Sequence, residues 1–493
     1  MSLPAPPLFV FEHSFAEQLE GLYVEWVPAD VAEPSLVVFN DDLAHSLGLD
    51  AAGLRSPEGI AALVGASVPG GARPLAQAYA GHQFGGYSPR LGDGRAVLLG
   101  ELIDPTGSRH DLHLKGSGRT PFARGGDGKA VLGPMLREYL FGEAMHALGI
   151  ASTRALAVVA TGENVARETM LPGAVLARVA SSHLRVGTFQ YVAATGDVEL
   201  LARLVDYAVR RHVPDAADES PRDQALALFA EVIERQASLI ADWMTVGFIH
   251  GVMNTDNVTI SGETIDYGPC AFMDAYDPDT VFSSIDHAGR YAYGNQPAIG
   301  AWNLSRFAET LLTLVDDDAD TAVEQLTELL QTYPPAFAGH WLDRMRSKLG
   351  IVADGAHNDD AGDQALAEEF LDILGEQAVD FTGAFRELST ALRRNSAPAL
   401  TPSDDERTAA WYQRWRSRVA PDAADRMDAV NPLYIARNHL VEEALDAATA
   451  GDLQPFNTLV ELLRSPFAHA GVDARYEQQA PANFGPYQTF CGT

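Results

Sequence analysis

The spacing of hydrophobic and polar positions changes near residue 192 of this chain. Before that point, short apolar runs alternate with glycine and proline turns, a pattern typical of strands. The runs that predict strands are "AVLLGEL" (96–102), "RHDLHLKGSG" (109–118), "RALAVVAT" (154–161) and "AVLARVA" (174–180). After it, apolar residues recur at helical spacing over 223–247, 301–346, 364–392, 404–419 and 432–464. The pattern predicts an α+β protein with a smaller β-rich half and a larger α-rich half.

Two helices are predicted within the β-rich half. The longer one, 133–150, has apolar residues at helical spacing, Pro134 near its start and Gly149 at its end. The shorter one, "DDLAHSLGL", has Asp41 or Asp42 as its N-cap. The longer helix follows the strand at 109–118 after a glycine-rich loop, so strand and helix are close in sequence.

Composition narrows the class of protein. The chain has 493 residues, a formal net charge of −32 and 46% hydrophobic residues, which suits a soluble globular protein. The acidic charge argues against binding to nucleic acid or to anionic membranes, because both attract basic proteins. No apolar run reaches membrane-spanning length, and the N-terminus lacks the basic segment and long apolar core of a secretory signal. We therefore expect a cytoplasmic monomer with no nucleic-acid or membrane partner.

Lysine is rare in this chain. Of its 35 Lys and Arg residues only Lys115, Lys129 and Lys348 are lysine. A lysine that is kept against such a bias is a candidate for a role that needs a compact ammonium group. Lys115 lies in the alternating strand, where it shares one face with His113 while leucines occupy the other.

The segment "HGVMNTDN" (250–257), followed by "IDYGP" (265–269), has the form of a kinase catalytic loop and metal-binding turn. Asn257 and Asp266 flank a strand-like hairpin, "VTISGETI". An amide oxygen and a carboxylate placed in this way can share a divalent cation, because Mg²⁺ takes oxygen ligands and completes its shell with nucleotide phosphates. Where the usual kinase loop has an acidic residue, this chain has Val252. The alternative is an exposed polar hairpin without chemistry.

Lys115 and the helix at 133–150 predict the nucleotide end of the same site. In kinases a strand lysine pairs with a helix glutamate and contacts the nucleotide phosphates. Glu138 follows Lys115 by 23 residues, which suits a strand, a loop and two helical turns, and Glu143 is the alternative partner. Taken alone, Glu138 also fits a solvent-facing helix carboxylate.

Glycine turns and two arginines complete the candidate phosphate contacts. "GDGR" (92–95) can form a hairpin tip whose backbone N–H groups and Arg95 face phosphate. "GGDG" is a second such turn, with Asp127 near its centre. Arg178 and Arg185 are seven residues apart and can clamp a phosphate through bidentate contacts. Ordinary surface arginines are the competing interpretation.

Several long segments together resemble the selenoprotein O family of protein adenylyltransferases, and the likeness runs nearly end to end. The most specific stretches are "YAGHQFGGYSPRLGDGRAVLLGE", "LHLKGSGRTPFARGGDGKAVLGPMLREYL", "ARVASSHLRVGTFQ" and "FIHGVMNTDNVTISGETIDYGPCAFMD". The resemblance implies a protein-kinase-like two-lobed fold, with an N-lobe over 1–191 and a helical C-lobe with a C-terminal extension over 192–493. It also implies that ATP binds in a reversed orientation. AMP rather than phosphate is then transferred to Ser, Thr or Tyr hydroxyls of protein substrates, and pyrophosphate is released.

The resemblance also assigns roles to the candidate residues. Lys115 and Glu138 are the expected strand–helix ion pair. Asn257 and Asp266 are the expected ligands of Mg²⁺ or Mn²⁺. Asp256 is the expected proton acceptor, and its alternative role is only to orient Asn257 or a metal-bound water. The residues expected to contact the nucleotide are Gly92, Gly94, Arg95, Lys115, Asp127, Gly128, Arg178, Arg185 and Asp266.

These assignments make chemical sense for nucleotidyl transfer. Lys115, Arg178 and Arg185 would stabilise the departing pyrophosphate. A loose transfer depends mainly on positioning and electrostatics, so an acid at 256 instead of 252 need not abolish it. The alternatives are a kinase-like phosphotransferase, which Val252 disfavours, and a non-catalytic ATP-binding scaffold. The sequence leaves open the choice between Mg²⁺ and Mn²⁺, UMP transfer from UTP, and the identity of the protein substrates.

The two cysteines, Cys270 and Cys491, are too few for a disulfide scaffold and lack zinc-site spacing. Within the resemblance, Cys270 falls four residues after Asp266, and Cys491 lies where some family members carry selenocysteine. A redox-controlled disulfide between them is one expectation, and two free thiols are the other.

Overall fold

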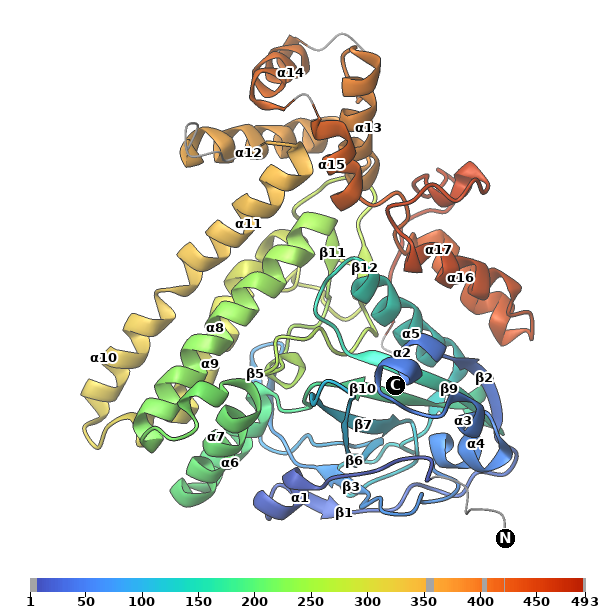
Figure 1. The fold of residues 1–493 in the computed structure, drawn as a ribbon, viewed down its shortest axis with the longest axis vertical. Helices are drawn as coiled ribbons and strands as arrows, with labels where there is room; N and C mark the ends of the chain where they lie inside the picture. Colours follow the sequence, from blue (N-terminus) through green and yellow to red (C-terminus); the bar gives the residue numbers. More distant parts are fainter. Residues whose placement is uncertain (1–6, 352–358, 401–405, 421, 491–493) are drawn as a thin grey trace.

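The computed structural model describes residues 7–351, 359–400, 406–420 and 422–490. An antiparallel sheet in the N-terminal part precedes a largely helical C-terminal part, which is the α+β arrangement predicted from the hydrophobic pattern (Figure 1). Within the described ranges, no helix combines the length and apolarity needed to cross a membrane.

The main sheet has eight strands in the order β1-β3-β6-β7-β10-β9-β2, with β8 paired to β10. Their bounds are β1 (Tyr23–Glu25), β2 (Ser35–Phe39), β3 (Leu75–Gln77), β6 (Ala96–Ile103), β7 (Arg109–Lys115), β8 (Ala130–Val131), β9 (Arg154–Ala166) and β10 (Met170–Ala180). The four predicted strands are confirmed as β6, β7, β9 and β10. The other four are two to five residues long, which is too short for a period of two to stand out in the sequence.

The register of the sheet decides which side chains meet. In the pairing of β7 with β10, His113 lies opposite Arg178 and Lys115 opposite Leu176. Opposed residues share a face, and so do residues two apart on one strand, so Lys115, His113 and Arg178 lie on one face. The predicted alternation of β7 is thereby confirmed.

The other face of the sheet is apolar. It carries Leu112 and Leu114, which belong to one buried cluster with the small helices of the N-terminal part. These helices are α2 (Asp41–Ser46), α3 (Ala51–Leu54) and α4 (Pro57–Val64). Helix α2 confirms the predicted short helix, but its N-cap is Asn40, whose side chain accepts from the backbone N–H of Leu43.

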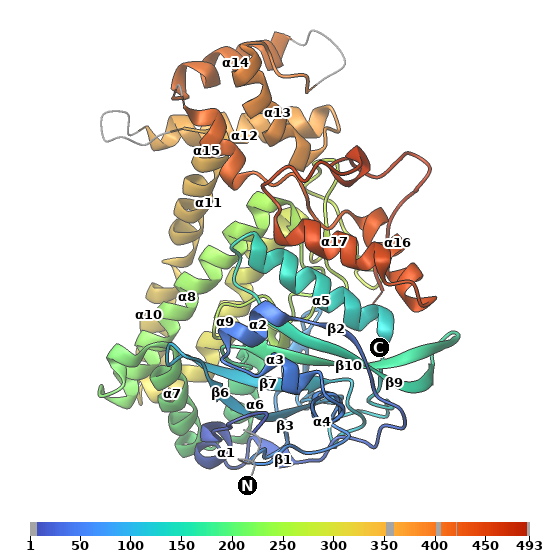
Figure 2. The ribbon, with the colours of Figure 1, turned by 45° about the vertical axis from the view of Figure 1, so that its right-hand side comes forward.

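Helix α5 (Leu132–Ala147) confirms the longer predicted helix and lies on the face of the sheet that carries Lys115. Twelve of its 16 residues are buried, including both candidate glutamates. Burial is this extensive because α16 (Asn438–Thr449) and α17 (Gln454–Arg464), near the end of the described chain, cover its outer side (Figure 2).

The remaining helices form two groups around separate apolar cores. The first group is α1 (Ser14–Gln18), α6 (Val186–Thr195), α7 (Val198–His212), α8 (Pro221–Val246), α9 (Gln296–Val315) and α10 (Ala319–Leu330). Helix α11 (Tyr333–Leu349) runs from this group to the second, which is α12 (Asp360–Glu376), α13 (Phe381–Arg394), α14 (Glu406–Arg418) and α15 (Ala423–Val430) (Figure 1). All five predicted helical stretches are confirmed as helical, although three of them contain more than one helix.

Two short pairs of strands complete the fold. β4 (Gly81–Gln83) pairs with β5 (Gly86–Ser88), and β11 (Phe248–Ile249) pairs with β12 (Ala271–Phe272). The expected hairpin at 258–265 is wrong: the chain turns there, but Thr259 bridges to Arg185 and Thr264 to Ser152. Both arms find backbone partners in neighbouring segments instead of each other. The expected boundary at 191/192 falls inside α6, and the division into two lobes stays a prediction.

Candidate active site

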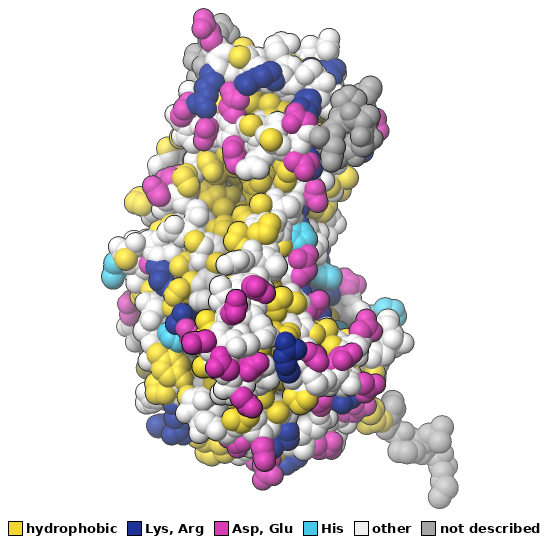
Figure 3. Space-filling view, turned by 90° about the vertical axis from the view of Figure 1, so that its left-hand side faces the viewer, with side chains coloured by type: hydrophobic (Ala, Val, Ile, Leu, Met, Phe, Trp, Pro, Cys, Tyr) yellow, Lys and Arg dark blue, Asp and Glu magenta, His cyan; other side chains and the backbone are white. Residues whose placement is uncertain are grey.

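A cavity of about 490 Å³ lies between the sheet and the loop at 252–257. Its size suits a small-molecule ligand. The described residues that line it include seven basic side chains and four carboxylates, in a chain whose net charge is −32. By contrast, the outer face in Figure 3 carries many Asp and Glu side chains among fewer Lys and Arg. Positive charge is therefore concentrated where an anionic ligand would be enclosed.

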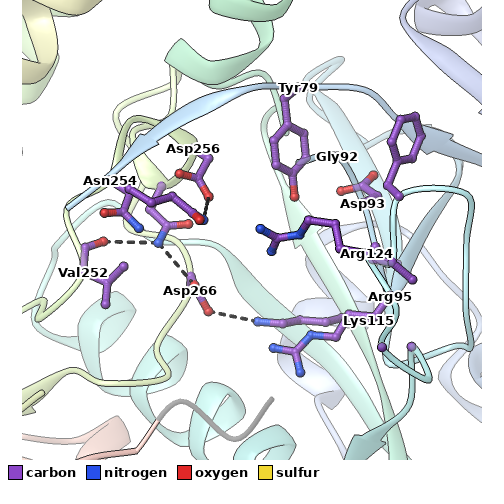
Figure 4. Close-up of a pocket in the computed structure, with 18 of the residues that line it drawn as sticks. Tyr79, Gly92, Asp93, Arg95, Lys115, Arg124, Val252, Asn254, Asp256 and Asp266 are labelled. Carbon is purple, nitrogen blue, oxygen red and sulfur yellow. Dashed lines mark hydrogen bonds and ion pairs between the residues drawn. The ribbon is translucent and has the colours of Figure 1, made fainter. Parts of the chain in front are cut away.

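Lys115 forms the predicted ion pair with Glu138. Its Nζ donates to Glu138 Oε2. It also lies 3.2 Å from Asp266 Oδ1, a contact marked in Figure 4. Burial would raise the pKa of Glu138, but Lys115 and Arg178 outweigh burial and lower it. The alternative partner, Glu143, is engaged by other residues, Arg154 and Arg464. Glu138 is therefore the partner of Lys115 and is a buried carboxylate instead of a solvent-facing one.

Arg178 is held on three sides. Its Nη1 donates to Glu138 Oε1 at 3.2 Å, its Nε to His183 Nε2 at 3.2 Å, and its Nη2 to His113 Nδ1 at 3.1 Å. Arg178 is only 3% exposed, yet it lines the cavity. Its competing interpretation as an ordinary surface arginine is excluded.

Arg185 is buried and lines the cavity beside Asp256. Its guanidinium lies 4.6 Å from the centre of the Tyr79 ring, and its Nη1 donates to the backbone oxygen of Asp256 at 2.9 Å. Its buried Nε finds no hydrogen-bond partner among the described residues. A buried guanidinium with unused N–H capacity beside a cavity is a donor for an anionic ligand.

The loop at 250–257 is held from two directions. His250 Nε2 bonds to the backbone oxygen of Ile265 at 2.9 Å, which ties the loop to the turn that carries Asp266. Asn254 Oδ1 accepts from the Phe84 backbone N–H at 3.0 Å, so the β4–β5 hairpin braces the loop from outside. Val252 is buried in the loop, and its backbone oxygen accepts from Asn257 Nδ2 at 3.2 Å.

Asn257 and Asp266 meet in the cavity, as predicted. Asn257 Nδ2 donates to Asp266 Oδ2 at 3.3 Å. Asp266 has a left-handed backbone, with φ 66°, which aims its carboxylate toward Lys115. Burial alone would raise the pKa of Asp266, but Lys115 and Arg95 hold it well below its usual range. Asp266 is therefore ionised and able to act as a cation ligand.

Asp256 has the opposite electrostatic environment. Burial raises its pKa to about 6, because the nearby Arg185 compensates only in part. Gln83 Nε2 donates to Oδ2 at 3.3 Å, while the buried Oδ1 lacks a partner in the described part of the chain. Two carboxylates of one cavity with pKa values moved apart are a signature of different chemical roles.

The predicted glycines pack two loops against each other. Gly92 has a φ of 71°, and a Cβ there would lie 2.4 Å from the Phe122 ring. A Cβ at Gly128 would lie 2.3 Å from the backbone N of Arg119. Asp127 binds Arg167 at 2.8 Å, which lowers the pKa of its carboxyl. These turns bring Gly94 and Arg95 to the cavity lining.

Six polar residues that line the cavity lie outside both the candidate residues and the glycine turns named from the sequence. They are Tyr79, Gln83, Arg124, Lys129, Arg167 and Asn254. Lys129 carried a usable signal, since it is one of only three lysines in the chain. The others could be recognised only through contacts with segments distant in sequence.

Cys270 is fully buried, and burial raises the pKa of its thiol to about 12. The final described segment approaches it, since Thr489 Oγ1 donates to the backbone oxygen of Pro269 at 2.7 Å. Cys491 lies outside the described residues, so the disulfide between Cys270 and Cys491 stays a prediction.

Comparisons with known proteins agree with this site. The family model described as "Protein adenylyltransferase SelO" matches residues 8–464, and the chain belongs to this family. It is accordingly an enzyme of the protein nucleotidyltransferase class. "Protein nucleotidyltransferase YdiU" of Mycolicibacterium smegmatis is 58% identical over 498 residues, with 100% of each chain covered. The protein of the same name from Mycobacterium sp. (strain KMS) is 57% identical, with 97% of this chain and 98% of the relative covered. That from Cereibacter sphaeroides (strain ATCC 17029) is also 57% identical, with 98% and 100% covered.

Proposed function

We propose that this chain transfers AMP from ATP to Ser, Thr or Tyr hydroxyls of protein substrates and releases pyrophosphate. The observation that carries the proposal is the excess of basic side chains around the cavity of a strongly acidic protein, beside a loop with Val252 in place of an acid. A triphosphate is the kind of ligand that such a cavity attracts. The sheet, the Lys115–Glu138 pair and the Asn257–Asp266 pair support a protein-kinase-like two-lobed fold around it.

Three buried cations, Lys115, Arg178 and Arg185, would bind the β- and γ-phosphates. Charge develops on the departing pyrophosphate during transfer, so fixed cations at that end lower the barrier. This requires the α-phosphate to face the acceptor, the reverse of the kinase orientation. Gly92, Gly94, Arg95, Asp127 and Gly128 would complete the nucleotide contacts at the two glycine turns.

Asn257 and Asp266 would hold a divalent cation, Mg²⁺ or Mn²⁺. The residues fit such a cation, because an ionised carboxylate and an amide are oxygen donors. No group of three or more His, Cys, Asp or Glu side chains in the described ranges is arranged to hold a metal, and Mg²⁺ needs only one or two protein ligands beside phosphates. When bound, the cation neutralises phosphate charge.

Asp256 would accept the proton of the acceptor hydroxyl. A base is most effective when its pKa lies near the working pH, and burial brings the pKa of Asp256 to about 6. Gln83 Nε2 donates to Oδ2 and so orients the carboxylate in the cavity. Asp256 would take the role of the acidic residue that the usual kinase loop has at the position of Val252.

ATP labelled at either the α- or the γ-phosphate, incubated with the protein and lysate of its own cells, tests the proposal. We expect label from the α position in protein, and none with Lys115→Ala or Asp266→Ala. Label from the γ position would identify a kinase instead. ATP binding without label from either position would identify a non-catalytic scaffold. UTP labelled at the α position, with Mg²⁺ or Mn²⁺, tests the breadth of the reaction.

A further inference from the structure

Two histidines lie directly behind Arg178, away from the ligand side of the cavity. His113 on β7 and His183 after β10 are both buried, and their rings stack with centres 4.4 Å apart. Each is backed by an aspartate: His113 Nε2 lies 2.9 Å from Asp93 Oδ2, and His183 Nδ1 lies 3.1 Å from Asp111 Oδ2. The result is two parallel chains of the form aspartate–histidine–Arg178.

The protonation of both rings follows from Arg178. A guanidinium has only donors, so the ring nitrogens that face it must accept. His113 therefore carries its proton on Nε2 and donates it to Asp93. His183 carries its proton on Nδ1 and donates it to Asp111. Both imidazoles are neutral, in agreement with their pKa values, which burial and the nearby Arg178 lower.

The aspartates are themselves fixed. Asp93 accepts from the backbone N–H of Gln77 at 3.0 Å. Asp111 accepts from the backbone N–H of His183 at 2.8 Å and binds Arg211 at 2.6 Å. Backbone N–H groups therefore fix the two aspartates, the aspartates orient the two histidines, and the histidines orient Arg178.

Glu138 is the one carboxylate paired with Arg178 among the described residues, and it is shared with Lys115. Carboxylates at positions 113 and 183 as well would hold Arg178 but would cancel the charge that a phosphate needs. Imidazole lone pairs hold the guanidinium without adding negative charge. Three of the five N–H groups of Arg178 donate to His113, His183 and Glu138, and the other two have no partner in the described part of the chain and can donate to a ligand.

We propose that His113 and His183 are positioning residues that hold Arg178, still charged, in the geometry that binds the nucleotide phosphates. The inference rests on the proposed role of Arg178 as a phosphate contact. It predicts a specific effect, namely that losing either acceptor weakens binding of ATP but not of adenosine, which has no phosphate.

Isothermal titration of ATP and of adenosine separates this role from a structural one. His113→Leu and His183→Leu remove the acceptor and should each weaken ATP binding about tenfold, as expected for a lost hydrogen bond to a charged group, while adenosine binding changes less than about twofold. His113→Asn puts an amide oxygen near the lost Nδ1, and His183→Gln puts one near the lost Nε2. These two variants should retain most of the ATP affinity.

The exchanged variants, His113→Gln and His183→Asn, keep a polar side chain but misplace its oxygen. They should lose ATP affinity as the leucine variants do, and they serve if a leucine variant fails to fold. His110→Leu is the matched control, because His110 lies on the same strand and is paired with Asp104 but does not line the cavity. It should leave both affinities unchanged.

Three results would overturn the inference. The first is a parallel loss of ATP and adenosine binding, which indicates a merely structural role. The second is unchanged ATP binding in the leucine or exchanged variants while Arg178→Ala weakens it. The third is normal ATP binding by Arg178→Ala itself, because the proposed phosphate contact then fails and the inference falls with it. In an Arg178→Ala background, His183→Leu should have no further effect on ATP binding.

Discussion

At the scale of single residues, two carboxylates of one cavity are driven in opposite directions by their surroundings. Asp266 faces Lys115 and is held ionised, whereas Asp256 is buried with one oxygen unpartnered among the described residues. Both follow from the same rule: a cation within reach favours the charged form, and burial opposes it. Which effect wins depends on a few ångströms of geometry.

Asp256→Asn should lower kcat by about 10²- to 10⁴-fold, because a positioned base contributes that much, while ATP affinity stays nearly unchanged. In the unmodified protein the rate should rise with pH through about 6, as Asp256 loses its proton. Single-turnover transfer at several pH values measures both. A pH profile flat across 5 to 7 would reduce Asp256 to an orienting residue.

The same substitution should stabilise the protein at neutral pH. The pKa of Asp256 is raised in the folded state, so the native protein binds more protons than the unfolded chain between about pH 4 and 6. The contribution of Asp256 to the free energy of unfolding therefore falls as pH rises across that window. Above pH 6, the free energy of unfolding of the Asp256→Asn variant should exceed that of the unmodified protein by about 2–3 kcal/mol. At pH 4 the two proteins should differ little. Urea unfolding at pH 4 and pH 7.5 checks the difference.

At the scale of elements, the site depends on loops that hold backbone against backbone. The turn at 92–95 packs on the loop that carries Phe122, and Thr120 Oγ1 donates to the backbone oxygen of Asp93 at 2.6 Å. The β4–β5 hairpin likewise binds the loop that carries Asn254. Gly92 lets the two loops pack closely because it has no Cβ, so this glycine makes the site more rigid instead of more flexible.

Gly92→Ala should weaken ATP binding and destabilise the fold. Both Gly92 and Gly107 have left-handed backbones, so alanine costs about 1–2 kcal/mol at either position. At Gly107 a Cβ meets nothing within 4 Å, whereas at Gly92 it collides with the inner atoms of Phe122. Gly92→Ala should therefore lower the free energy of unfolding, measured in urea, by about 1–3 kcal/mol more than Gly107→Ala does. Equal losses would show that the loops separate without cost.

At the scale of the whole molecule, Arg437 joins parts that are far apart in the sequence. It is fully buried and binds Asp274 at 2.6 Å, Asp380 at 2.5 Å and the backbone oxygen of Glu477 at 3.2 Å. These partners belong to the segment after the Asp266 turn, to the start of α13 and to the C-terminal segment. One side chain thus connects the helices around the second apolar core to the segment that follows the Asp266 turn of the active site.

Arg437→Met should destabilise the protein by about 3–5 kcal/mol, because it leaves two carboxylates without their buried partner. Arg393→Met is the control, since Arg393 also binds two aspartates but is 44% exposed, and it should cost at most about 1 kcal/mol. Urea unfolding midpoints compare the two. A small effect of Arg437→Met would mean that the parts of the fold are held together by apolar packing alone.

The sequence by itself determined the elements and much of the chemistry. Alternation with a period of two placed His113 and Lys115 on one face of β7, and helical spacing with a suitable separation selected Glu138 as the partner of Lys115. The rarity of lysine pointed to Lys115 before any motif did. These features are local, so they are visible in a run of neighbouring residues.

Only the tertiary structure decided how Arg178 is held, how Asp256 is buried and what closes the cavity. The histidine contacts of Arg178 depend on the register of β7 with β10 and on a loop that returns His183 to Asp111. Asp256 owes its raised pKa to burial, while Arg185 and Gln83, the latter on a hairpin more than 150 residues earlier, oppose the rise. Such contacts join segments that hydrophobic periodicity treats as independent, so their energies exist only once the chain has folded.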